Sequence, residues 1–177
     1  MNNEILTILV SALIAFLVAW ATVRAEESKG RAALYALCCR FFIAAFNAID
    51  TQTGKIKTSQ LDKERYVQEL ESILSALEAF SSNPLFIKFV SRNELAPAML
   101  VQVRSEMVEH RQTQTEQFAL NRGSVQFFLD AFDWCKKMPW GVWLSRHKRM
   151  NELAAYLRQW MEGHQQGVPV PTTKPCG

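Results

Sequence analysis

The sequence contains few of the residues and motifs from which catalytic and cofactor sites are commonly built. It has 7 glycines in 177 residues and no cluster of them, so no GxGxxG, Walker A or GxSxG motif is present. The 3 histidines, His110, His147 and His164, lie far apart and form no HExxH pattern. We therefore expect no catalytic residue, no cofactor and no bound metal, although an enzyme with an unfamiliar site remains an alternative.

The cysteines are few and are poorly spaced for metal or redox chemistry. Cys38 and Cys39 are adjacent, while Cys135 and Cys176 stand alone, so the chain has no CxxC pair. The spacing is also unlike the disulfide framework of a small secreted domain. It favours buried free thiols in a reducing compartment.

Charge is absent from Ile5 to Val23, a run of 19 residues. As a helix this run is about 28 Å long at ~1.5 Å per residue, close to the roughly 30 Å of a bilayer's hydrocarbon core. It predicts a transmembrane helix whose span includes Ile5, Leu6, Leu13, Phe16, Trp20 and Val23. The run is long, and no Lys or Arg precedes it. Both features favour a retained anchor over a cleaved signal peptide, despite an Ala19-Trp20-Ala21 sequence that resembles a cleavage site.

Basic residues flank this run on one side only. No Lys or Arg precedes it, whereas Arg24, Lys29, Arg31 and Arg40 follow within 17 residues. Because positively charged flanks stay in the cytoplasm, we expect a single-pass protein with its N-terminus outside and its C-terminal domain inside.

The rest of the chain has helical periodicity and no convincing period-two alternation. Apolar residues recur at i, i+3 and i+4 in five segments, which are 34–49, 67–80, 99–107, 125–135 and 150–161. The predicted fold is all-α, with one transmembrane helix followed by a cytoplasmic bundle of four to six helices. We divide the chain into an anchor with its flank (1–27), a helical domain (28–167) and a disordered, proline-rich tail (168–177).

Local signals place the ends of several helices. Residues 50–58 form a polar loop, and Ser59 with Asp62 then forms a capping-box pattern at the start of a helix. Pro84 is expected at the first position of another helix. Asn121 to Gly123 resembles the end of one helix, with Ser124 as the cap of the next. Phe42, Leu74, Phe128 and Leu157 are predicted to face one core.

The segment from Ala32 to Ile49 allows a second interpretation. It is 18 residues long and is interrupted only by Arg40 and Asn47, so it could be a second span that forms a hairpin through residues 24–31. Arg40 would then lie near the bilayer centre, at a cost of roughly 2.5 to 3.5 kcal/mol. A bundle helix that continues from the anchor explains the same residues more simply.

Two polar features need a choice between functional and structural interpretations. Glu106 and His110 resemble half of a di-iron motif, but their spacing is i, i+4 and no second copy exists, so we expect a solvated helix face. The polar face of the helix at 60–80 is acidic and would suit a protein partner, although a solvated face is commoner.

The segment 136–150 is basic and rich in tryptophan. Its candidate lipid-surface residues are Lys136, Lys137, Trp140, Trp143, Arg146, Lys148 and Arg149. Nucleic-acid binding is less favoured, and tryptophans buried in the core are the structural alternative. We expect membrane lipid and an unidentified protein as partners. The favoured function is non-catalytic, with the helical domain binding or scaffolding that protein at the membrane surface. The alternatives are a subunit of a larger membrane complex and a tethered enzyme or effector.

Overall fold

The computed structural model describes residues 2–114, 118–137 and 144–163, and within these ranges the side chains of residues 2–9 and 144–147 are not described. The described residues form six helices, which are α1 (Asn2–Ala48), α2 (Gln60–Ser82), α3 (Ile87–Arg92), α4 (Leu95–Gln112), α5 (Arg122–Lys136) and α6 (Leu144–Glu162). The only β-type pairing recorded among them is an isolated bridge between Ile49 and Ile56. The prediction of an all-α bundle is confirmed. The predicted tail at 168–177 lies outside the described residues.

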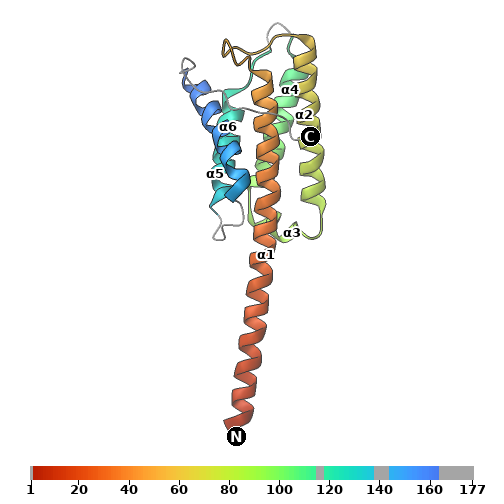
Figure 1. Cartoon of the computed structure of the whole chain (residues 1–177). Helices are drawn as coiled ribbons and strands as arrows, with labels where there is room; N and C mark the ends of the chain where they lie inside the picture. Colours follow the sequence, from red (N-terminus) through yellow and green to blue (C-terminus); the bar gives the residue numbers. More distant parts are fainter. Residues whose placement is uncertain (1, 115–117, 138–143, 164–177) are drawn as a thin grey trace.

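Helix α1 is 47 residues long and is continuous. Its first half projects beyond the other helices, and its second half packs among them (Figure 1). We call the part from Val10 to Val23 the stem. A hairpin through residues 24–31 is therefore wrong, because these residues are helical and hold the two halves in line.

The helices of the bundle alternate in direction. Phe41 stacks on Phe128 with ring centroids 3.9 Å apart, and nearer the stem Arg31 donates to the backbone oxygen of Lys137, so α5 runs antiparallel to α1. Helix α2 is also antiparallel to α1, because Arg40 bonds Ser72 while Ala48 lies near Asp62. The bundle thus has a stem end, where α3 and the end of α5 lie, and a far end, where the 50–59 loop lies (Figure 1).

Two glycines solve specific steric problems. Gly30 lies inside α1, and a Cβ added there would come within 2.5 Å of the Phe89 ring, so its role is to admit α3 rather than to make a turn. Gly54 has φ of 66°, a left-handed conformation that glycine adopts without strain. Its backbone oxygen accepts a hydrogen bond from Trp160 Nε1 at 3.0 Å, which ties α6 to the far-end loop.

The core is one cluster built from all six helices and the 118–120 segment. Phe42, Phe128 and Leu157 are fully buried, as the periodicity predicts, while Leu74 is only partly buried at the edge of the cluster. Cys38 and Cys135 are buried free thiols, and Cys39 is half-buried. Cys176 lies outside the described residues.

Some predicted helix ends are correct and others are displaced. Ser59 caps α2 as expected, because its hydroxyl accepts from the Asp62 amide. Pro84 does not open a helix: residues 84–86 form a turn, and α3 begins at Ile87. Asn121, not Ser124, caps α5, because its side chain accepts from the amides of Gly123 and Ser124.

Candidate functional site

The stem exposes apolar side chains on every side. Each residue from Val10 to Val23 is exposed, including four of the residues predicted for the span, Leu13, Phe16, Trp20 and Val23. Ile5 and Leu6 lie among residues whose side chains are not described. Over the side chains that the structure does describe, no helix has both the length and the apolar character needed to cross a membrane.

The stem end of the bundle gathers three elements around one stretch of α1. Phe89 of α3 packs on Gly30. Arg31 pairs with Glu27 at 2.5 Å, lies 4.2 Å from the Trp134 ring and donates to the Lys137 backbone oxygen. One arginine thus holds the end of α5, up to Lys137, against α1.

The predicted lipid-surface residues begin at this end. Lys136 and Lys137 are exposed, and Lys136 reaches Asn151 at 2.8 Å and Asp133 at 3.6 Å. Lys148 is exposed and Arg149 is half-buried near the start of α6. The side chains of Trp140, Trp143 and Arg146 lie outside the description, so their contribution to a lipid surface stays a prediction.

A group of polar side chains is buried between α2, α4 and α5. Glu106 and His110 are each 1% exposed, and His110 Nε2 lies 3.1 Å from Glu106 Oε1. Tyr66 donates to the same oxygen at 3.1 Å, and Ser124 donates to Oε2. The expected solvated face for Glu106 and His110 is therefore wrong.

The sequence contained a signal for this burial. Glu106 and His110 follow Met99 and Val103 at helical spacing, so they continue the apolar stripe of α4 instead of opposing it. The energetic reason is that Tyr66, Ser124 and His110 form hydrogen bonds with the Glu106 carboxylate, and these bonds offset the cost of burying it. Tyr66 and Ser124 come from distant positions in the chain, and periodicity alone does not reveal them.

Burial raises the pKa of Tyr66 and of two cysteines in the bundle. Desolvation, followed by the nearby carboxylate of Glu106, raises the pKa of Tyr66 well above its usual range. Desolvation and the neighbouring Cys135 thiol raise the pKa of Cys38, and burial raises the pKa of Cys39 to about 12. These thiols are protonated at neutral pH, so they are poor nucleophiles and poor metal ligands.

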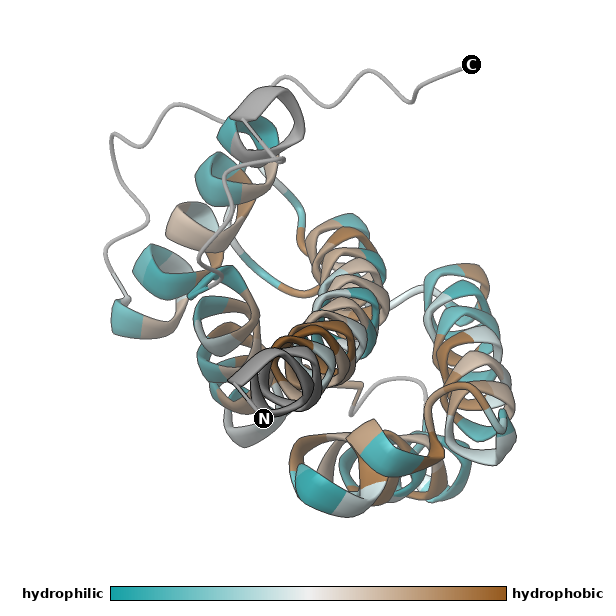
Figure 2. Ribbon diagram, turned by 90° about the horizontal axis from the view of Figure 1, so that it is seen from below, coloured by the Kyte–Doolittle hydropathy of each residue, from teal (hydrophilic) through white to brown (hydrophobic). Residues whose placement is uncertain are grey.

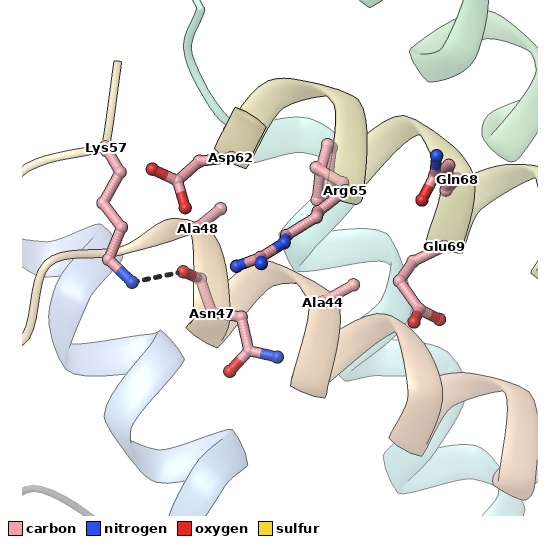
Figure 3. A pocket seen from close by; sticks show the side chains of 9 residues that line it. Ala44, Asn47, Ala48, Lys57, Asp62, Arg65, Gln68 and Glu69 are labelled. Carbon is pink, nitrogen blue, oxygen red and sulfur yellow. Dashed lines mark hydrogen bonds between the residues drawn. The ribbon is translucent and has the colours of Figure 1, made fainter. Parts of the chain in front are cut away.

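An open pocket of about 530 Å³ lies at the far end, between the last turns of α1 and the first turns of α2. Figure 3 shows Arg65 and Lys57 reaching toward Asn47, with Asp62 and Glu69 on either side. Lys57 Nζ donates to the Asn47 backbone oxygen at 2.7 Å. The mixed charges suit a polar ligand or peptide, and none of the lining side chains is a Ser, Cys or His nucleophile.

The acidic face of α2 is largely paired within the bundle. Glu78 pairs with Arg104 at 2.6 Å, Glu71 with Arg111, and Glu69 with Arg40 at 3.7 Å. The excess of acidic residues in α2 therefore does not give the folded bundle an unbalanced acidic surface.

The described residues contain no group of three or more His, Cys, Asp or Glu side chains that could hold a metal ion. Comparison with known proteins adds nothing further: no family model, curated protein or solved structure matches this chain.

Proposed function

We propose that this chain is a single-pass membrane protein whose helical bundle binds or scaffolds a protein partner at the cytoplasmic face. The observation that carries the proposal is the stem, where exposed apolar side chains surround the helix from Val10 to Val23 and project clear of the bundle (Figure 1). A surface helix of a water-soluble domain would instead have one apolar stripe.

The span proposed for the bilayer is Ile5 to Val23, which includes the residues before Val10 that are uncharged in the sequence. Arg24 lies directly after it, with its guanidinium 5.3 Å from the Trp20 ring. Tryptophan and arginine at a span's end suit the headgroup region, and the one-sided basic flank favours a cytoplasmic bundle.

A non-catalytic role is favoured because the buried group of ionisable side chains around Glu106 is closed to solvent. Glu106 and His110 are buried and serve as partners for each other, Tyr66 and Ser124, so no substrate reaches them in this state. The open far-end pocket has a mixture of charges that would suit a polar segment of a partner.

The membrane part of the proposal is tested by extraction of the full chain from membranes at alkaline pH. We expect the protein to resist extraction, and the double variant Leu13→Arg/Leu17→Arg to be released, because each arginine near the centre costs roughly 2.5 to 3.5 kcal/mol. The matched control is Val101→Arg/Val108→Arg, which places the same charges at exposed apolar positions of α4. Release of the unaltered chain would contradict the proposal.

Topology has its own test. A reporter fused after Gly177 and one inserted into the 50–58 loop should both report the cytoplasmic side. Reporters that place the loop and the C-terminus outside would overturn the orientation.

The alternative of a subunit in a larger membrane complex is favoured by the small residues Ser11, Ala15 and Ala19, whose spacing permits close packing of helices. Photo-crosslinking groups at Ala15 and at Gln68 of the far-end pocket separate the two. A partner captured from Gln68 supports binding by the bundle, whereas capture from Ala15 alone supports assembly through the stem.

A further inference from the structure

The stem end of the bundle carries an apolar and basic surface that the sequence did not reveal. In the turn before α3, Leu85 is 75% exposed, the highest value among the large apolar side chains of the described residues, and Ile87, the first residue of α3, is 57% exposed. Lys88 and Arg92 of α3 are exposed beside them. We call these four residues the α3 surface.

The opposite side of α3 is well packed, so this exposure is not a loose segment. Phe89 is buried against Gly30, Phe80 lies 4.6 Å from Phe86 between ring centroids, and Asn93 donates to the Phe89 backbone oxygen at 3.0 Å. Helix α3 is therefore packed against the bundle on one side and exposed on the other.

The position of α3 along α1 identifies what could cover it. Phe89, Arg92 and Asn93 line a cavity of about 210 Å³ together with Val23, Glu26 and Glu27. Val23 is the last residue of the proposed span, and Gly30 lies about 10 Å further along at ~1.5 Å per residue. The headgroup layer of one leaflet is roughly 5 to 8 Å thick. Gly30 therefore lies just beyond this layer, whereas Glu26 and Glu27, which line the cavity with α3, lie within it.

The distribution of charge in the bundle also suits a membrane contact at the stem end. The segments 24–31, 85–94 and 136–137 contain seven Lys or Arg and three Glu. At the far end, the segments 50–69 and 109–111 contain five bases and five acids. The view along the stem shows the helices of the bundle grouped around α1, so an anchored bundle would turn this basic end toward the bilayer (Figure 2).

We infer that the α3 surface is a second membrane contact, with Leu85 and Ile87 entering the interface and Lys88 and Arg92 meeting anionic headgroups. This inference rests on the proposed function, because the anchor sets the height of α3. Two attachments, the span and α3, hold the bundle in one orientation and keep the far-end pocket directed away from the membrane.

The test uses the full chain with Cys176→Ser, reconstituted into vesicles of phosphatidylcholine and phosphatidylglycerol. A polarity-sensitive dye is attached at Leu85→Cys in one sample and at Leu61→Cys in another. Leu61 is a matched control, an exposed leucine at the far end. We expect the dye at position 85 to emit at shorter wavelength, to be quenched by a lipid-borne quencher and to resist iodide, while the dye at position 61 does the reverse.

The charge contribution is tested with Lys88→Gln/Arg92→Gln, against Lys55→Gln/Arg65→Gln at the far end. The first pair should lessen quenching at position 85 by the lipid-borne quencher, and the second should leave it unchanged. Protein that floats with vesicles while position 85 is as accessible to iodide as position 61 overturns the inference alone. Protein that does not float overturns the proposed function, and the inference with it.

Discussion

The two halves of α1 share one continuous backbone and have opposite surroundings. In the stem every side chain is exposed, and nearly all are apolar. In the half from Leu34 to Ile49 most apolar side chains are buried, and the exposed positions follow one line along the helix, which is formed by Ala36, Arg40, Ile43 and Asn47. The two halves are both strongly apolar, so the distribution of polar residues around the helix distinguishes them.

The largest difference between the halves is expected in the free energy of unfolding when one phenylalanine in each half is replaced by alanine. Phe42→Ala removes a fully buried ring and should lower the free energy of unfolding of the bundle by about 3 to 5 kcal/mol. Phe16→Ala removes a ring that is 65% exposed and should leave bundle stability unchanged. Chemical denaturation of the full chain in detergent, followed by near-ultraviolet circular dichroism, measures both. Equal losses would mean that the stem packs on the bundle.

Alkaline pH should destabilise the bundle around the buried half of α1 and leave the stem unchanged. The pKa of Tyr66 is raised in the folded chain, so its stabilising contribution is complete below its ordinary value near 10 and is lost as the pH rises toward the folded value. The free energy of unfolding should fall above pH 10 by up to about 1.4 kcal/mol per pH unit from this group. The stem has no titratable side chain between Ile5 and Val23, so its helical signal in detergent should persist.

The variant Tyr66→Phe isolates this effect. It removes one donor to Glu106 at a cost of about 1 kcal/mol at neutral pH, and it should flatten the alkaline dependence. An unchanged slope would show that other groups, such as the Cys38 thiol, dominate the loss.

Gly30 marks the border between the halves, since it is the first buried residue of α1 among those described. Gly30→Ala forces its Cβ against the Phe89 ring, at a cost of about 1 to 3 kcal/mol. The better helix propensity of alanine offsets about 1 kcal/mol of this. In a Phe89→Ala background the same change should become stabilising, and a double-mutant cycle measures the reversal. An effect of the same sign in both backgrounds would contradict the close contact.

The smallest effect is expected at Arg40, the one charged residue between Ala32 and Ile49. Its ion pair with Glu69 spans 3.7 Å, and both side chains are about half exposed, so Arg40→Leu should cost less than about 1 kcal/mol. Arg104→Leu, which breaks a similar exposed pair with Glu78, is the control. A large loss at Arg40 alone would show that the α1–α2 contact depends on charge.

The sequence predicted those parts of the fold that depend on local pattern. Helical periodicity identified the core positions Phe42, Phe128 and Leu157, and the capping box at Ser59 was correct. It did not predict the burial of Glu106, because the partners Tyr66 and Ser124 come from other helices. The sequence also did not explain Gly30, because the requirement for glycine there comes from the Phe89 ring, which belongs to a distant segment. The exposed α3 surface is similarly a consequence of how α3 packs on α1.

The most direct test of the central claim compares thiol reactivity along α1 in membranes. Ala15→Cys and Ser28→Cys are placed separately in the full chain with Cys176→Ser; both positions are exposed in the folded chain. Cys38 and Cys135 are buried, and the raised pKa of Cys39, about 12, keeps its thiol protonated at pH 7. A water-soluble maleimide should modify Ser28→Cys from the cytoplasmic side. It should modify Ala15→Cys at least about tenfold more slowly, because a thiolate does not form in hydrocarbon. Equal rates at the two positions would contradict the claim that the stem lies in the bilayer.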